Sequence, residues 1–142
     1  MKVSHEYDVE FGDTDPAAIV FYPNFFKWYD AGTWRLFREA GLTLEVLREE
    51  FGMLGFPIVD TRSKFRSPVR FGDRVRITSE IVSFRSKTFH VQHEVWVGDR
   101  LCTEATEVRV LGRAPESNPD GMEAAEIPNK IKQRLSGGDP AL

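Results

Sequence analysis

The spacing of hydrophobic and polar residues changes along the chain, and each pattern predicts a different kind of element. Residues 5 to 11 place Tyr7, Val9 and Phe11 on one side and three acidic residues on the other, which is the period of a half-buried strand. From about residue 23 to residue 40 the apolar residues recur with the period of a helix, in an arc that aromatic side chains widen. Because this arc is so wide, we expect the helix to be enclosed on more than one side.

Proline and glycine mark the ends of the predicted helices. Pro23 suits the first helical position, since its φ angle is fixed and it has no N–H to leave unbonded. Gly41 follows the long helix where a C-cap is expected, and Gly52 ends a short second helix predicted from Leu44 to Phe51.

The segment from Ile58 to Leu111 alternates apolar and polar residues, and it predicts four strands joined by short turns. Short connections require an antiparallel meander, and the long apolar helix must be buried against it. We therefore predict an α+β fold in which a curled antiparallel sheet wraps around one central helix. The open edges of such a sheet favour edge-to-edge pairing of protomers, so a homo-oligomer is expected.

The C-terminal part has a different composition. Residues 112 to 126 are rich in proline, glycine and acidic residues and predict a loop, whereas residues 127 to 135 form a short amphipathic segment. We predict one domain over residues 1 to 135 and a flexible tail over residues 136 to 142.

The composition is typical of a globular domain and disfavours several classes of binding protein. A chain of 142 residues with 41% hydrophobic residues is one ordinary globular domain. The 19 basic residues against 22 acidic ones give a net charge of −3, which predicts no general attraction to nucleic acid or to an anionic membrane. The sequence has no apolar run of membrane-spanning length and no signal-peptide pattern, so a cytoplasmic location is expected.

The sequence lacks the motifs of zinc sites, of nucleotide-cofactor sites and of α/β-type hydrolases. The histidines have no zinc-binding spacing, and His90 and His93 point to opposite sides of one predicted strand, so both are interpreted as structural. Cys102 is the one cysteine and is interpreted as a small buried residue. No nucleophile elbow, dinucleotide fingerprint or P-loop is present, so no cofactor is expected and a nucleotide enters only as part of a substrate.

The segment FGDTDPAAIVFYPNFFKWYD, residues 11 to 30, contains the strongest candidate chemistry. Asp15 precedes the start of the long helix, where backbone N–H groups near Tyr22, Asn24 and Phe25 are expected to lack intrahelical partners. Such N–H groups carry the positive end of the helix dipole and can bind a developing oxyanion. A carboxylate facing these donors indicates acyl-transfer chemistry.

Two details of this segment remain open from the residues alone. Asp13 forms turns as readily as Asp15, but the apolar AAIVFYP sequence after Asp15 would leave its carboxylate poorly solvated and more reactive. The Tyr22 ring is expected to act as a buried aromatic staple at the helix start, which would immobilise the Tyr22 amide.

The same segment resembles the signature of the 4-hydroxybenzoyl-CoA thioesterase family of hotdog-fold enzymes. The similarity continues through GFPIVDTRSKFRSPVRFGD and FRSKTFHVQHEV, and it covers roughly residues 5 to 111. It implies a hotdog fold and a thioesterase in which Asp15 carries catalysis. It also implies that the Tyr22 amide polarises the thioester carbonyl.

The resemblance further suggests how the substrate is held. The position that matches Asp30 is an aspartate near the aromatic acyl group in the family, although Asp30 alone could equally be a solvated residue at the edge of the apolar arc. Family members commonly bind coenzyme A phosphates with basic residues in the region of Arg85, Ser86 and Lys87. The basic strand face formed by residues 62, 64 and 66 is the alternative.

The sequence therefore predicts an acyl-CoA thioesterase that acts on a 4-hydroxybenzoyl-like thioester, assembled as a homotetramer, a dimer of dimers. Asp15 is expected either to attack the carbonyl carbon or to deprotonate a water. The alternatives are a thioesterase for short or medium aliphatic acyl groups, an acyl-CoA binding module without turnover, and a hydratase or dehydratase on the same fold.

Overall fold

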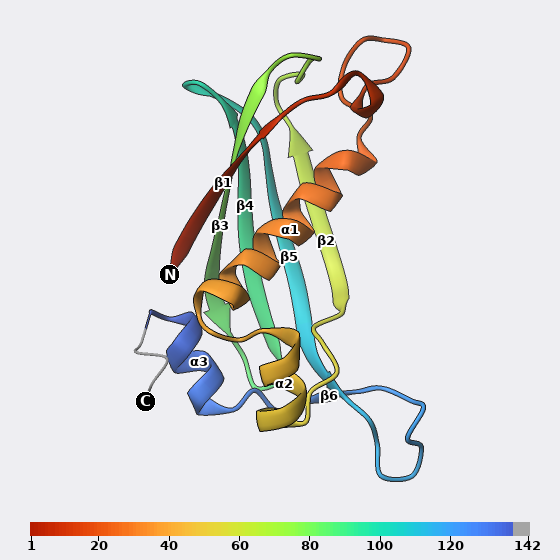
Figure 1. Cartoon of the computed structure of the whole chain (residues 1–142), viewed down its shortest axis with the longest axis vertical. Helices are drawn as coiled ribbons and strands as arrows, with labels where there is room; N and C mark the ends of the chain where they lie inside the picture. The colour runs from red at the N-terminus through yellow and green to blue at the C-terminus, as the bar shows by residue number, and fades with distance from the viewer. Residues whose placement is uncertain (138–142) are drawn as a thin grey trace.

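The computed structural model describes residues 1–137. Its elements are β1 (Lys2–Asp8), the 3-10 helix η1 (Phe11–Asp13), α1 (Pro23–Glu39), α2 (Leu44–Phe51), β2 (Ile58–Phe65), β3 (Arg74–Phe84), β4 (Thr88–Val97), β5 (Arg100–Arg113), β6 (Glu123–Ala125) and α3 (Asn129–Leu135). The strands form an antiparallel sheet in the order β1-β3-β4-β5-β2, and β6 pairs with the end of β5. Figure 1 shows this sheet with α1 running across one face.

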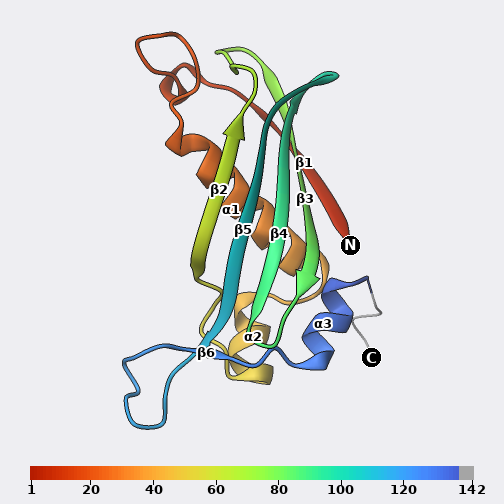
Figure 2. The same cartoon turned by 180° about the vertical axis from the view of Figure 1, so that it is seen from behind.

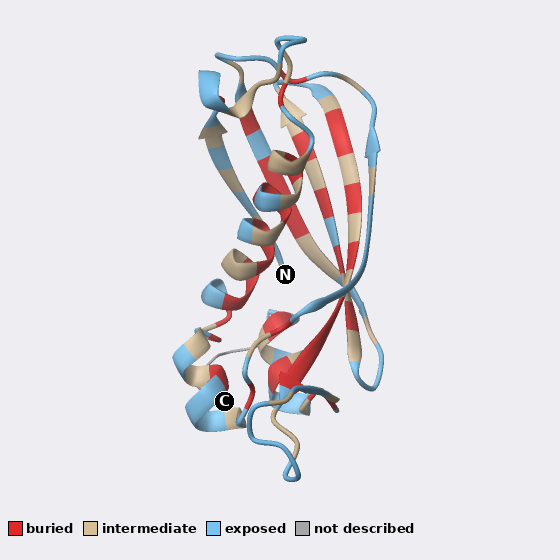
Figure 3. Cartoon of the chain, turned by 90° about the vertical axis from the view of Figure 1, so that its right-hand side faces the viewer, coloured by how far each residue is buried: buried red, intermediate tan, exposed pale blue. Residues whose placement is uncertain are grey.

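The curled sheet and the single long helix confirm the predicted hotdog architecture. Figure 2 shows that no helix of residues 1–137 covers the other face of the sheet, while α2 and α3 gather at one end of the strands. The side of α1 that faces the sheet is buried, as are alternate residues of β3, β4 and β5 (Figure 3). Leu36, Phe37, Phe89 and Val91 are fully buried and belong to one core cluster.

The local signals for the helix ends are confirmed. Pro23 occupies the first turn of α1, and Gly41, with a φ angle of 73°, follows the helix in the left-handed region that favours glycine. α2 begins after Thr43, whose hydroxyl accepts a hydrogen bond of 3.2 Å from the Val46 N–H, and it ends at Gly52 with a φ angle of 66°.

Two boundaries differ from the predictions. β1 ends at Asp8 and not at residue 11, because residues 11 to 13 turn into η1. The predicted loop over residues 112 to 126 contains β6, a strand of three residues whose backbone pairs with the end of β5. The amphipathic segment that follows is α3, and it buries Ile131 and Leu135. The predicted tail falls largely outside the described residues.

The helix approaches the sheet closely at one position. A Cβ atom at Gly32 would overlap the Ser79 hydroxyl, so only glycine allows this spacing between α1 and β3. Across residues 1–137, we find no helix that is long and apolar enough to span a membrane.

Candidate active site

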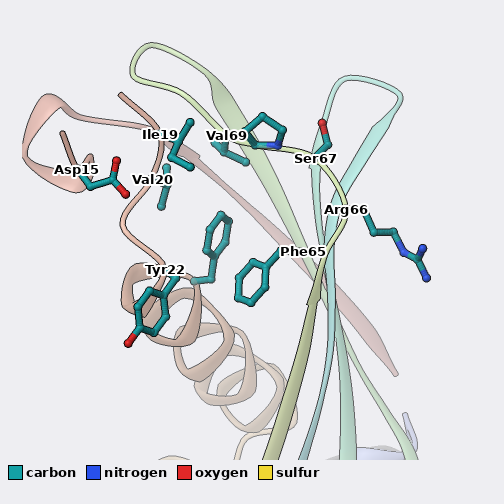
Figure 4. A pocket seen from close by; sticks show the side chains of 10 residues that line it. Asp15, Ile19, Val20, Tyr22, Phe65, Arg66, Ser67 and Val69 are labelled. Carbon is teal, nitrogen blue, oxygen red and sulfur yellow. The ribbon is translucent and has the colours of Figure 1, made fainter. Parts of the chain in front are cut away.

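A cavity of about 360 Å³ opens where the loop before α1 meets the end of β2. Asp15 and Tyr22 line it from the loop and the helix start, and Phe65 and Arg66 line it from the end of β2 (Figure 4). The remaining wall is mostly apolar and comes from Ile19, Val20, Phe25, Ser67, Pro68 and Val69. The cavity therefore combines a carboxylate with an apolar surface that could hold an acyl group.

A tight backbone turn presents Asp15 to this cavity. The Asp15 N–H donates to the Ile19 carbonyl at 2.9 Å, and the Asp15 carbonyl accepts from the Ala18 N–H at 2.8 Å. Ala18 adopts a φ angle of 63°, which is uncommon for a residue with a side chain. Within residues 1–137, Asp15 Oδ1 accepts one hydrogen bond, from the Ala17 N–H at 2.9 Å, and Oδ2 accepts none. One carboxylate oxygen is therefore available for chemistry.

Asp13 has a different role from Asp15, and it does not line the cavity. Its Oδ2 accepts from the Tyr7 hydroxyl at 2.9 Å and from the Glu10 N–H at 2.8 Å, while its carbonyl accepts from the Asn24 side chain at 2.9 Å. The hydrogen bond to Asp13, together with burial and the nearby negative charge, raises the pKa of Tyr7 to about 12. Asp13 thus ties the loop to β1 and to the start of α1.

The Tyr22 N–H is the free donor at the start of α1. The Asn24 and Phe25 N–H groups donate to the carbonyls of Phe21 and Tyr22 at 3.0 and 3.1 Å, so the prediction that they are free was wrong. Pro23 has no N–H, and the Tyr22 N–H finds no acceptor within residues 1–137. Tyr22, whose N–H is unpaired within the described residues, therefore lines the same cavity as Asp15.

The Tyr22 ring is not the buried staple that the sequence suggested. It is 60% exposed, and its ring centroid lies 5.4 Å from that of Phe21 in an edge-to-face arrangement. The position of the amide is set instead by the backbone, since the neighbouring Phe21 N–H donates to the Asp13 carbonyl at 2.8 Å.

The basic residues predicted to bind phosphate lie in two places. The turn formed by Arg85, Ser86 and Lys87 joins β3 to β4 at the end of the sheet near α3, opposite the start of α1 (Figure 1). Ser86 contacts the chain before α3, since its carbonyl accepts from the Ile127 N–H at 2.8 Å. One chain therefore does not bring this turn to Asp15.

The alternative basic face is divided by the structure. Arg66 lines the cavity and pairs with Glu104, and this hydrogen bond lowers the pKa of Glu104. Arg62 and Lys64 line a separate hollow of about 220 Å³ with Gln92 and other outward-facing residues. Of this group, only Arg66 lines the cavity of Asp15, and Figure 4 shows its side chain on the opposite side, pointing away from Asp15.

Asp30 lies outside the cavity of its own chain and takes part in a different arrangement. Its Oδ1 accepts a hydrogen bond of 2.9 Å from Arg109, whose side chain is only 4% exposed. Arg109 also donates to Glu107, and Glu107 in turn lies 2.9 Å from His93 Nε2. His93 Nδ1 is 2.7 Å from the Ser79 hydroxyl.

Hydrogen bonds dominate the electrostatics of this buried cluster. Burial alone would raise the pKa of Glu107, but hydrogen bonds and charge from His93 and Arg109 lower it to about 2. The carboxylate is therefore ionised, so Nε2 of His93 donates to it. His93 and Glu107 are therefore both engaged in buried hydrogen bonds, and a structural role for His93 stays a prediction.

The sequence reasoning missed the Glu107–Arg109 pair, although a signal was present. On β5, Ala105, Glu107, Arg109 and Leu111 share the face that points toward α1. Charged residues at inward positions of an alternating strand are costly unless paired, and this pattern alone predicts an internal ion pair.

Comparisons with known proteins show which proteins the chain is similar to. The sequence profile of the thioesterase-like superfamily matches residues 9–135. The 4-hydroxybenzoyl-CoA thioesterase of Pseudomonas sp. (strain CBS-3) is 32% identical over 133 residues, which cover 89% of this chain and 92% of that protein. A 1,4-dihydroxy-2-naphthoyl-CoA hydrolase of Thermosynechococcus vestitus is 24% identical over 105 residues, covering 72% and 71% of the two chains.

Solved structures show the same fold. A mutant 4-hydroxybenzoyl-CoA thioesterase in complex with 4-hydroxybenzoyl-CoA superposes with a TM-score of 0.85 at 29% identity, covering 94% of this chain and 98% of the other. A gentisyl-coenzyme A thioesterase superposes with a TM-score of 0.77 at 30% identity, covering 94% and 99%.

Proposed function

Because the chain belongs to the thioesterase-like superfamily, we propose that it hydrolyses 4-hydroxybenzoyl-CoA, or a closely related hydroxylated aromatic CoA thioester, to the free acid and coenzyme A. The chain is a thioester hydrolase of the hotdog fold. The observation that carries the proposal is that Asp15 and Tyr22 line one cavity, and that within residues 1–137 one Asp15 carboxylate oxygen and the Tyr22 N–H have no hydrogen-bond partner.

These two groups suit the two demands of thioester hydrolysis. The Tyr22 N–H would donate to the carbonyl oxygen, which becomes negatively charged as the tetrahedral intermediate forms. The start of α1 adds the positive end of its dipole. Thiolate is a good leaving group, so the C–S bond breaks without a strong acid, and the site needs one nucleophile or base.

Asp15 supports two routes. Its free oxygen could attack the carbonyl carbon, forming a mixed anhydride and releasing the CoA thiolate, after which water would cleave the anhydride and regenerate the carboxylate. Alternatively, Asp15 could accept a proton from a water that attacks the carbonyl carbon directly. Both routes require the same placement of Asp15 and Tyr22.

The proposal includes an assembly in which a second copy completes the site. β2 is an edge strand and is exposed along almost its whole length. If two copies pair through β2 about a two-fold axis near its middle, Phe65 of one chain lies beside the partner's Ile58. Ile58 is opposite Arg109 on β5, so this pairing would bring the partner's Asp30 toward the Asp15 cavity.

The same assembly accounts for the position of the predicted phosphate site. The turn from Arg85 to Lys87 lies at the end of the sheet where β2 begins. We infer that a neighbouring chain supplies this turn to the nucleotide, as part of a homotetramer. A cytoplasmic location and the absence of any cofactor other than the substrate's own coenzyme A remain predictions from the sequence.

A substrate screen tests the proposed function. Release of free thiol is measured for 4-hydroxybenzoyl-, benzoyl-, phenylacetyl-, butyryl- and hexanoyl-CoA with the wild type and with Asp15→Ala. We expect the hydroxylated aromatic thioester to have the highest kcat/KM and every activity to depend on Asp15. If the wild type hydrolyses the aliphatic thioesters equally well, the aliphatic thioesterase replaces this proposal. If it hydrolyses none, the chain is a binding module.

A further inference from the structure

A line of buried polar side chains crosses the interface between α1 and the sheet and reaches the surface at Asp30. The line begins at Ser79 and His93, continues through Glu107, and passes to Arg109. The side chains of His93, Glu107 and Arg109 are between 0% and 4% exposed, whereas that of Asp30 is 49% exposed. Asp30 is thus the point at which a rigid internal network meets solvent.

Arg109 is held by buried partners on several sides. Its Nε and one terminal nitrogen form a fork on Glu107, with distances of 3.1 Å to Oε1 and 2.9 Å to Oε2. Its other terminal nitrogen donates to the Phe56 carbonyl at 3.1 Å, and the guanidinium lies 5.3 Å from the centre of the Phe56 ring. Because a guanidinium is planar, these contacts fix the direction of the N–H group that reaches Asp30.

This geometry has a direct effect on Asp30. A half-exposed aspartate on a helix would otherwise exchange among rotamers. The hydrogen bond from Arg109 fixes Oδ1 at 2.9 Å, while Oδ2 accepts no hydrogen bond within residues 1–137. Asp30 lies one helical turn from Phe26 and one turn from Trp34, and both rings are partly buried. The Asp30 side chain therefore has an aromatic neighbour on each side along the helix surface.

We propose that Arg109 is a positioning residue for substrate selection, which orients Asp30 so that its free oxygen accepts the hydrogen bond of a hydroxyl group on the aromatic acyl ring. This inference rests on the proposed function, because it assumes that the acyl ring of a thioester reaches Asp30. Glu107 allows Arg109 to be buried, because its negative charge pairs with the guanidinium and offsets the free-energy cost of removing that charge from water. Lysine could not replace Arg109, because one ammonium group cannot hold the Glu107 fork and Asp30 in a fixed plane.

The experiment compares selectivity across matched variants. The ratio of kcat/KM for 4-hydroxybenzoyl-CoA to that for benzoyl-CoA is measured for the wild type, Asp30→Ala, Arg109→Met, Arg109→Lys and the double variant of Asp30→Ala with Arg109→Met. We expect Arg109→Met to lower the ratio about tenfold or more and Arg109→Lys to lower it by several-fold. The double variant should show no further loss beyond Asp30→Ala.

Ser79→Ala is the matched control, because it breaks the other end of the same network without touching Asp30. It should lower the unfolding temperature and leave the ratio unchanged. Arg109→Lys retains the positive charge, so the ratio can still be measured with this variant if Arg109→Met does not fold.

The outcomes separate this inference from the proposed function. If Asp30→Ala removes the preference and Arg109→Lys keeps the full wild-type ratio, the positioning role is refuted while the thioesterase stands. A wild type that hydrolyses both thioesters equally also overturns the role, again without affecting Asp15. Loss of the ratio in Ser79→Ala as well as in Arg109→Lys would show a general packing effect and overturn it too.

Discussion

The loop before α1 and the strand β5 behind its middle each place a carboxylate near a hydrogen-bond donor, Asp15 in the loop and Glu107 on β5, but the two carboxylates differ in how far they are paired. In the loop, one oxygen of Asp15 and the N–H of Tyr22 have no hydrogen-bond partner within residues 1–137. In the middle, Glu107 accepts from Thr33, His93 and Arg109, so both its oxygens are occupied. A carboxylate held at a pKa of about 2 is a poor base and a poor nucleophile. The comparison therefore assigns reactivity to the unpaired group and stability to the paired one.

Removing the unpaired carboxylate should have the largest effect on activity. Asp15→Ala is expected to lower kcat by at least about a hundredfold, because Asp15 is the one carboxylate among the described residues that line the cavity, and to leave the fold intact. Asp13→Ala is the control, and it should mainly lower the unfolding temperature, since Asp13 ties the loop to Tyr7 and Glu10. Steady-state thiol release and thermal unfolding measure the two effects. If Asp13→Ala lowered kcat more than Asp15→Ala, Asp13 would be the catalytic carboxylate and Asp15 the one that holds the loop.

Asp30 belongs to both regions, since it is paired on one oxygen and free on the other. Asp30→Ala should remove the preference for hydroxybenzoyl over benzoyl thioesters, a change of about 1 to 3 kcal/mol in relative kcat/KM for a hydrogen bond to a charged group. Hydrolysis that depends on Asp15 should continue. The ratio of kcat/KM for the two thioesters measures the effect, and an unaltered ratio would remove Asp30 from the substrate site.

The buried pairing of Glu107 should make the free energy of unfolding depend on pH. The pKa of Glu107 falls from 4.5 to about 2 on folding, so its pairing stabilises the protein fully above about pH 4.5. This contribution is lost as the pH falls from about 4.5 toward about 2. Glu107→Gln should therefore show a flatter decline in the free energy of unfolding over this range, measured by urea denaturation.

An exposed ion pair provides the comparison for this measurement. Glu123 pairs with Arg113 at 3.1 Å, and both side chains are about half exposed. Glu123→Gln should leave the pH dependence close to that of the wild type, because exposed pairs contribute little. Equal slopes for Glu107→Gln and the wild type would contradict the assignment of a lowered pKa to Glu107.

The smallest expected effect concerns the turn of Arg85, Ser86 and Lys87, which is proposed to bind phosphate and lies at the opposite end of the sheet from the start of α1. Replacing Arg85 and Lys87 with alanine should raise KM for CoA thioesters several-fold with little change in kcat, because such contacts act equally in the ground and transition states. Added salt should weaken the binding of CoA thioesters to the wild type, so that its KM rises toward that of the double variant. The matched variant replaces Arg62 and Lys64. If only this second pair changes KM, the nucleotide binds the outer face of β2.

The sequence predicted the features that depend on neighbouring residues in the chain, such as the helix ends. Pro23, Gly41 and Gly52 mark helix ends through their own backbone preferences, and the apolar arc of α1 requires a surrounding sheet. β6 could not be predicted, because its three residues form a strand only by pairing with β5. Asp15 and Tyr22 could be placed together, since both precede one helix start.

Other parts of the site depend on contacts between distant segments. The Asn24 N–H looked free from its place in the helix, but the turn at Phe21 supplies its acceptor. The link from Asp30 to Arg109 joins positions that are 79 residues apart, and no local pattern connects them. The distance between Arg85 and Asp15 likewise follows from strand order, and joining the two requires a neighbouring chain.

A single-turnover experiment tests most directly whether the unpaired carboxylate performs the chemistry. Enzyme in excess is mixed with 4-hydroxybenzoyl-CoA, and thiol release is followed in the wild type and in Asp15→Asn, with binding of the thioester measured separately. We expect both proteins to bind with similar affinity and Asp15→Asn to release thiol at least about a hundredfold more slowly. Release at the wild-type rate by Asp15→Asn would contradict the account.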